Sequence, residues 1–171
     1  MRKPGIGVCA TDAGYVLLGL LEDKHGFERM TSLPVLREVA LGWTTLFCAN
    51  LSEIAHYVQV TNAMYKVLKA HIPGAFTFIL PALSSVPRRL QDAKKKTIGV
   101  RVSGALIMQA LLAAFQQPLV GFELVGFDDV ECLRPWVDFV ITGGEGEQDF
   151  TTVVDLSTEL PHVYRQGIGK F

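Results

Sequence analysis

Short apolar runs separated by polar turns recur along the whole chain, and they predict nine β-strands. Most of these runs are rich in Val, Ile, Leu, Phe and Thr and are too short for a buried helix. The predicted strands are Gly5 to Ala10, Tyr15 to Leu20, Thr44 to Ala49, Phe76 to Leu80, Thr97 to Val102, Pro118 to Phe122, Val137 to Thr142, Thr152 to Leu156 and Val163 to Arg165. Segments with a helical period lie between several of them, which is typical of an α/β protein.

Four segments repeat their apolar residues every three to four positions, so we expect helices there. These segments are Lys24 to Ser32, Leu51 to Val58, Asn62 to His71 and Ala105 to Gln116. Asn50, with Glu53 three residues later, and Thr61 place side-chain oxygens where the free amides of a helix start need acceptors. The second and third helices should therefore begin directly after Asn50 and Thr61.

The predicted elements belong to one domain, because no repeat, low-complexity tract or flexible linker interrupts them between residues 1 and 171. The strands around Thr152 and Tyr164 follow turns rather than helices, which indicates a mixed sheet. The predicted fold class is thus α/β, with a single twisted mixed sheet and flanking helices.

The amino-acid composition limits the kinds of function that the protein can have. Hydrophobic residues make up 49% of the chain and charged residues 19%, which indicates a large interior. The 16 basic and 17 acidic residues give a net charge of -1, so any attraction to nucleic acid must come from a local patch. The uncharged stretch Val102 to Phe122 is broken by Gln and Pro residues, so we expect a buried helix and no membrane partner.

The three cysteines form no C-x-x-C motif, which argues against a disulfide framework or a zinc ribbon and favours a reducing, cytoplasmic location. The four histidines are scattered without metal-ligand spacing, so no metal site is expected.

Five motifs occur in an order that resembles the YrdC/YciO family. They are Thr11-Asp12-Ala13-Gly14-Tyr15, Pro73-Gly74-Ala75-Phe76-Thr77-Phe78-Ile79-Leu80, Thr97-Ile98-Gly99-Val100-Arg101-Val102, Thr152-Val153-Val154-Asp155 and Arg165-Gln166-Gly167. Val86-Pro87-Arg88-Arg89-Leu90 and Lys94-Lys95-Lys96 are most similar to the YciO branch. The alternative is a small doubly wound fold that matches the pattern by coincidence.

The resemblance implies a YrdC-like fold around a central, positively charged, anion-binding cavity. One branch of the family makes L-threonylcarbamoyl-AMP from ATP, L-threonine and bicarbonate for a tRNA modification. Carried over by motif, Thr11, Arg101 and Thr151 would bind the amino-acid substrate, and Thr97 and Arg165 would bind the nucleotide. ATP with Mg²⁺ would be a substrate, and no tightly bound cofactor is expected. For Arg101, the simpler interpretation is an edge-strand charge that reaches solvent.

This chain departs from the synthases in the residues that would face phosphate. Their Lys-x-Arg motif is missing, and Arg37 is the only nearby substitute. Their Ser-x-Asn motif is replaced by a stretch that contains Glu123, whose charge would repel a triphosphate if it pointed inward. Ser103 also replaces the proline that follows the Arg-Val pair. We therefore favour a nucleotide- or RNA-binding relative, with an active ATP-dependent synthase as the alternative.

A basic loop supports RNA as a partner. Its five cationic residues, offset only by Asp92, are Arg88, Arg89, Lys94, Lys95 and Lys96. We expect this loop to track the phosphates of transfer RNA or double-stranded RNA. The simpler alternative is a solvated loop without a ligand. The helix that precedes the first strand in the family has no counterpart here, so an apolar sheet face and a homo-oligomer are also expected.

Overall fold

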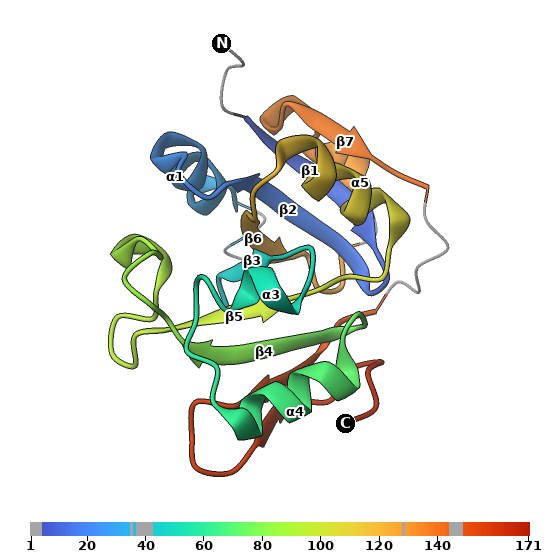
Figure 1. Cartoon of the computed structure of the whole chain (residues 1–171). Coiled ribbons are helices and arrows are strands. Elements are labelled where there is room, and N and C mark those ends of the chain that lie inside the picture. Colours follow the sequence, from blue (N-terminus) through green and yellow to red (C-terminus); the bar gives the residue numbers. More distant parts are fainter. Residues whose placement is uncertain (1–4, 35, 37–42, 128, 144–148) are drawn as a thin grey trace.

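A single nine-stranded sheet organises the computed structural model, which describes residues 5–34, 36, 43–127, 129–143 and 149–171. The strands are β1 (Ile6–Thr11), β2 (Gly14–Leu20), β3 (Thr45–Phe47), β4 (Phe76–Pro81), β5 (Thr97–Arg101), β6 (Leu119–Glu123), β7 (Phe139–Ile141), β8 (Thr152–Asp155) and β9 (His162–Arg165). Their order across the sheet is β7-β1-β2-β6-β3-β5-β4-β8-β9, from the orange β7 to the red β8 and β9 in Figure 1. All nine predicted strands are therefore present.

The sheet is mixed, as predicted. The pairs β1·β7, β3·β5 and β4·β8 are parallel, and the other neighbouring strands are antiparallel. As a result, β3 from the first third of the sequence lies beside β5, and β8 from the last third lies beside β4. The carboxyl ends of β1, β5 and β6 and the start of β8 consequently meet near one point.

The α-helices are α1 (Lys24–Ser32), α3 (Leu51–Ile54), α4 (Asn62–His71) and α5 (Leu106–Phe115), and η1 (Arg88–Leu90) and η2 (Val130–Trp136) are 3₁₀ helices. Side chains cap the first turn of α1, α3 and α4, whereas α5 begins without a side-chain cap. Asn50 and Thr61 cap α3 and α4 as predicted, accepting hydrogen bonds from Glu53 N and Met64 N.

The second predicted helix is shorter than expected. It ends at Ile54 instead of Val58, and the next residues form a turn in which His56 N donates to Glu53 O and Val58 N donates to Ile54 O, both at 3.1 Å. From Val58 onward the chain pairs with the end of β4: Val58 forms a bridge with Ala82, and Gln59 N donates to Pro81 O at 2.9 Å. The apolar period therefore continues through a turn that leads into this sheet-like contact.

Two apolar clusters pack against the sheet. The larger contains Met30 of α1, Ile54 of α3 and Leu68 of α4, and the smaller contains Met108 and Leu112 of α5. Alternate residues along β1, β2, β3 and β6 reach opposite clusters, as the two-residue period of a β-strand requires. Polar residues buried beside the smaller cluster form the site described below.

Two further expectations concern membranes and thiols. Within the described ranges, no helix has the length and apolar character needed to span a membrane. Cys9, Cys48 and Cys132 are free thiols, and burial raises the pKa of the Cys9 thiol to about 12. The cytoplasmic location stays a prediction.

Candidate functional site

The loop between β1 and β2 presents a threonine hydroxyl and a carboxylate at the end of a buried strand. The Thr11 hydroxyl donates to Gly14 O at 2.7 Å and accepts from Ala13 N at 3.1 Å, which closes the turn. Gly14 has φ of +85°, a conformation that side chains rarely adopt, so glycine is required there. The same hydroxyl also accepts a bond from Arg101 Nη2 at 2.8 Å.

Arg101 ends β5 and is fully buried, with 0% of its surface exposed. Its Nη2 atom donates to Asp12 Oδ1 at 2.6 Å as well as to Thr11. Its Nε and Nη1 atoms have no hydrogen-bond partner among the described residues. The interpretation of Arg101 as an edge-strand charge that reaches solvent is therefore wrong.

Asp12 is the main counter-ion of Arg101 and is held by several donors. Besides Arg101, Ser103 Oγ donates to Asp12 Oδ1 at 2.7 Å and Gly104 N donates to Oδ2 at 2.9 Å. Burial alone would raise the pKa of Asp12, but the Arg101 charge and these hydrogen bonds together lower it. Ser103, which stands where the family has proline, thus contributes a direct bond to the site.

Glu123 ends β6 and lies between two arginines. Its Oε2 atom accepts from Arg165 Nη2 at 2.6 Å, and its Oε1 atom is 3.9 Å from Arg101 Nη1. Oε1 also accepts from Thr151 N at 2.9 Å, and the side chain is only 6% exposed. Glu123 therefore points inward, and it binds the arginines that the family resemblance assigns to ligands.

Arg165 is fixed by the chain that precedes β8. Its guanidinium donates to the Thr151 carbonyl from Nε and Nη2, at 3.1 and 3.0 Å. Gly167 makes this contact possible, because a Cβ atom there would collide with the carbonyl of Phe150. The Arg-x-Gly motif thus allows the last strand to approach Thr151 closely.

The structure brings together four of the predicted site residues, Thr11, Arg101, Thr151 and Arg165, through Asp12 and Glu123. Thr97 is buried at the other end of β5, about 13 Å from Arg101 for four strand residues. Arg37 lies outside the described residues. The ligand roles assigned to all six residues stay predictions.

The electrostatics of this cluster differ from the positively charged cavity that we expected. Arg101 and Arg165 contribute two positive charges, and Asp12 and Glu123 contribute two negative charges, so the formal sum is zero. Among the described residues, no group of three or more His, Cys, Asp and Glu side chains is placed to hold a metal ion.

The sequence motifs did not identify Asp12 and Glu123 as the counter-ions of Arg101 and Arg165. One signal was available, since Arg101 and Glu123 are each the single charged residue of an otherwise apolar strand. Isolated opposite charges in buried strands predict an ion pair, because an unpaired buried charge is very costly. Which strands meet, however, depends on the sheet order.

The Asp12 network makes stability depend on pH. The pKa of Asp12 is lower in the folded protein than in the unfolded chain, where it is about 3.9. The ionised carboxylate therefore stabilises the fold fully above the unfolded pKa, and this stabilisation is lost as the pH falls through the folded pKa. We expect the free energy of unfolding in urea to decrease below about pH 4, and Asp12→Asn to flatten this part of the curve. The exposed control Glu159→Gln should follow the parent protein; an unchanged curve in Asp12→Asn would contradict the assignment.

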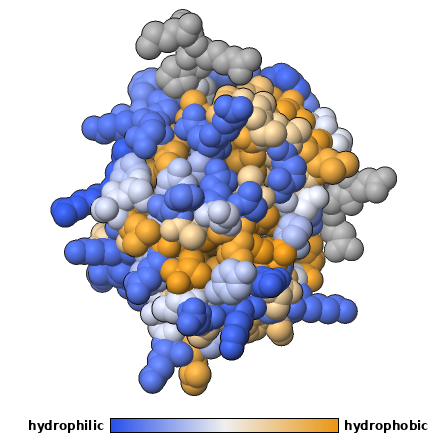
Figure 2. Space-filling view, in the orientation of Figure 1, coloured by the Kyte–Doolittle hydropathy of each residue, from blue (hydrophilic) through white to orange (hydrophobic). Residues whose placement is uncertain are grey.

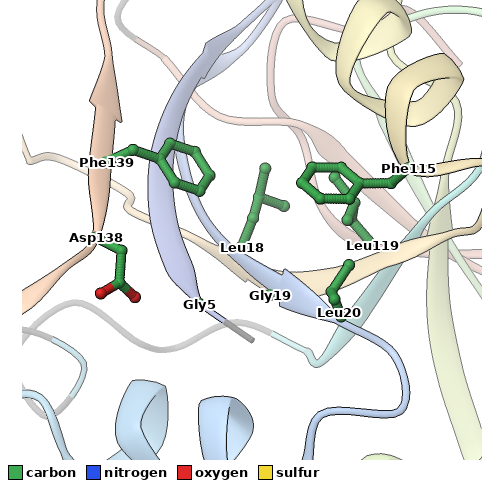
Figure 3. Close-up of a pocket in the computed structure, with 8 residues that line it drawn as sticks. All are labelled: Gly5, Leu18, Gly19, Leu20, Phe115, Leu119, Asp138 and Phe139. Carbon is green, nitrogen blue, oxygen red and sulfur yellow. The ribbon is translucent and has the colours of Figure 1, made fainter. Parts of the chain in front are cut away.

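One pocket borders the charged cluster around Arg101, and a second lies farther away along the sheet. The first, of about 440 Å³, borders the cluster through Ser103 and Gly104 and is also lined by Lys69 and Gln109. The other, of about 360 Å³, lies at the far end of the sheet, where Figure 3 shows Phe115 and Phe139 on either side of Leu18.

The second of these pockets is mostly apolar. It is lined by Gly5, Leu18, Gly19, Leu20, Phe115, Leu119, Asp138 and Phe139. Figure 2 shows hydrophobic residues gathered on the side of the molecule where α5 lies in Figure 1. Self-association through this side stays a prediction.

The basic loop lies between β4 and β5, on the left in Figure 1. Asp92 Oδ1 accepts from Lys94 N at 3.0 Å and from Lys95 N at 2.7 Å, which lowers the pKa of Asp92 and fixes the turn. All five cationic side chains are exposed. Arg89 Nη2 donates to Leu21 O at 3.1 Å, and Lys95 Nζ donates to the Tyr164 hydroxyl at 3.0 Å.

Comparison with known proteins places this chain in a family. The family model described as "Telomere recombination", for Sua5, YciO and YrdC proteins, matches residues 1–122. The chain belongs to the Sua5/YciO/YrdC family.

Two proteins, and the crystal structure of one of them, are similar to this chain. The YciO protein of Escherichia coli K12 is 40% identical over 180 residues, which cover 99% of this chain and 86% of that protein. The E. coli YciO crystal structure superposes with a TM-score of 0.88, at 39% identity and the same coverage. A threonylcarbamoyl-AMP synthase of Shigella dysenteriae is 30% identical over 119 residues, covering 68% of this chain and 55% of the synthase.

A further structural comparison involves a more distant protein. Sua5 of P. abyssi, complexed with L-threonine, has a TM-score of 0.79 at 19% identity, covering 95% of this chain and 50% of that one. At this identity the likeness shows the shared fold. The YrdC-like fold is thereby confirmed, and the doubly wound alternative is excluded.

Proposed function

We propose that this protein binds the phosphates of RNA or of a nucleotide, and that it is not an efficient threonylcarbamoyl-AMP synthase. The observation that carries this proposal is Glu123, whose carboxylate contacts both Arg101 and Arg165. Adenylyl transfer needs positive charge on the α-phosphate and on the departing pyrophosphate. Here each arginine is already paired with a carboxylate, so a triphosphate would have to displace Glu123.

Phosphate binding is assigned to the basic loop, where cationic side chains are exposed. A hollow of about 430 Å³ lies within this loop, with Arg88 and Lys96 among its lining residues. Asp92 also lines it, but its Oδ1 atom already accepts from two backbone amides. Lysines and arginines around such a hollow suit an RNA backbone or a nucleotide phosphate, and the binding should weaken steeply with salt.

Charge reversal in the loop tests this assignment. In Lys94→Glu/Lys95→Glu/Lys96→Glu, three cations become three anions, so we expect retention of RNA on filters at about 50 mM salt to be lost. A matched control reverses three other exposed lysines, Lys24, Lys66 and Lys170, which lie outside the basic loop. If the triple variant and the parent protein retained RNA equally, the loop would be an ordinary solvated surface without an RNA-binding role.

The alternative, an active synthase, is supported by the family and by the L-threonine bound in the P. abyssi Sua5 structure. The test incubates the protein with labelled ATP, L-threonine, bicarbonate and Mg²⁺ and follows pyrophosphate release with and without threonine. The proposal expects no threonine-dependent release above background. Threonine-dependent release at about one per second or faster would overturn it in favour of the synthase.

A further inference from the structure

Three aromatic rings form a cluster beside the basic loop. Trp43 precedes β3, and His162 and Tyr164 belong to β9. The Trp43 and Tyr164 ring centres are 5.6 Å apart with a tilt of 31°, and His162 meets Tyr164 edge to face at 4.9 Å. Tyr164 is 43% exposed, and His162 is exposed as well. Trp43 is half-buried, and none of the three rings belongs to either apolar cluster.

A β-bulge places Tyr164 in this cluster. Val153 pairs with Arg165 and the next residue, Val154, pairs with Val163, so Tyr164 is the extra residue of β9. A bulged residue has no partner across the ladder, and the local bend re-aims its side chain. Tyr164 can therefore contact Trp43 while Arg165, the next residue, still reaches Glu123.

Lys95 connects this cluster to the basic loop. Its ammonium lies 3.0 Å from the Tyr164 hydroxyl and 5.6 Å from the ring centre, so it sits at the hydroxyl edge of the ring. The hydrogen bond that the Lys95 ammonium donates to the Tyr164 hydroxyl raises the pKa of Lys95. A cation at the ring edge leaves the ring faces to the aromatic neighbours and to ligands.

The chemistry of this arrangement suits an unpaired nucleobase. Exposed aromatic side chains bind single-stranded nucleic acid by stacking, while nearby cations hold the backbone. In an A-form duplex the bases are already stacked and paired, so side chains of this kind cannot reach their faces. The aromatic rings thus distinguish single strands, whereas the basic loop alone does not.

We propose that Trp43, His162 and Tyr164 form a stacking platform for an unpaired base of an RNA strand whose adjacent phosphates lie on the basic loop. This inference rests on the proposed phosphate binding by that loop. It adds that the ligand is single-stranded at this point, and it assigns base contacts to residues outside the arginine cluster.

The fluorescence of Trp43 tests the platform directly. The chain has two tryptophans, so Trp136→Phe leaves Trp43 as the only indole. Single-stranded oligoadenylate should quench its emission with a saturating curve that follows filter retention. An abasic oligonucleotide of equal length should be retained through its phosphates without quenching, and a duplex of equal length should also leave the emission unchanged.

Substitutions at Tyr164 separate stacking from charge. Tyr164→Ala should weaken retention of oligoadenylate by about tenfold, whereas Tyr164→Phe, which keeps the ring and loses the bond to Lys95, should stay within about twofold of the parent. Retention of oligoadenylate without quenching, or with unchanged affinity in Tyr164→Ala, would overturn the platform and leave phosphate binding intact. Absence of both retention and quenching would overturn both proposals.

Discussion

Replacing Arg101 with methionine is expected to lower the free energy of unfolding by about 3 to 5 kcal/mol. The substitution keeps an unbranched side chain of similar length but leaves the half-buried Asp12 without its cation and the buried Glu123 with Arg165 alone. Removing one partner of a buried ion pair costs far more than the pair contributes, because the remaining charge is not solvated. Urea denaturation at pH 7, followed by circular dichroism, measures the loss.

Two controls make this result specific. Arg134→Met breaks an exposed pair with Glu131 and should leave the denaturation midpoint almost unchanged. In Arg101→Met/Asp12→Asn the carboxylate that has lost its counter-ion is removed while Glu123 keeps Arg165, so much of the lost stability should return. If Arg101→Met alone were as stable as the parent protein, the buried charge network would not contribute as described.

The largest expected effect on binding comes from Glu123→Gln. Glutamine keeps the size of the side chain and an acceptor for Thr151 N, but it removes the negative charge between Arg101 and Arg165. Two partly uncompensated guanidinium groups would then favour an anionic ligand, since charges interact strongly at buried sites. We expect the Kd for pyrophosphate, measured by calorimetry, to fall at least tenfold relative to the parent protein.

The source of that gain can be checked within the same site. Glu123→Gln/Arg165→Ala should lose the improvement, because the freed guanidinium is removed. The surface variant Glu131→Gln should bind pyrophosphate like the parent protein. Equal pyrophosphate affinities in the parent protein and in Glu123→Gln would mean that Glu123 does not exclude anions, and the argument against a synthase would fail with it.

Much of the fold could be predicted because local signals and tertiary structure agree. Capping by Thr61 and the apolar period define α4 over Asn62–His71, and the short apolar runs define the strands. The second helix was predicted too long because its last residues form a turn that leads into the contact of Val58 and Gln59 with the chain around Pro81. No local pattern contains that tertiary contact, so the apolar period alone does not show where the regular helix ends.

The site could be predicted only in part, and for a comparable reason. The family motifs identify Thr11, Arg101, Thr151 and Arg165, which the sheet brings together. They do not reveal that Glu123 ends a strand directed at the same point, because that depends on which strands are neighbours. Nor does a motif predict the Ser103 bond to Asp12, since the family has proline at that position.

The position of β8 in the sheet has a consequence for the order of folding. β4 pairs with β5 on one side and with β8 on the other, although β8 lies more than 70 residues later in the sequence. Such distant pairings slow folding, because a long loop must close before they form. During synthesis the chain emerges with its N-terminal part first, so Glu123 is present well before Arg165. The sheet and its charge network can therefore be completed only after Arg165 has left the ribosome, and until β8 pairs with it β4 remains an open edge for chaperones or for neighbouring chains.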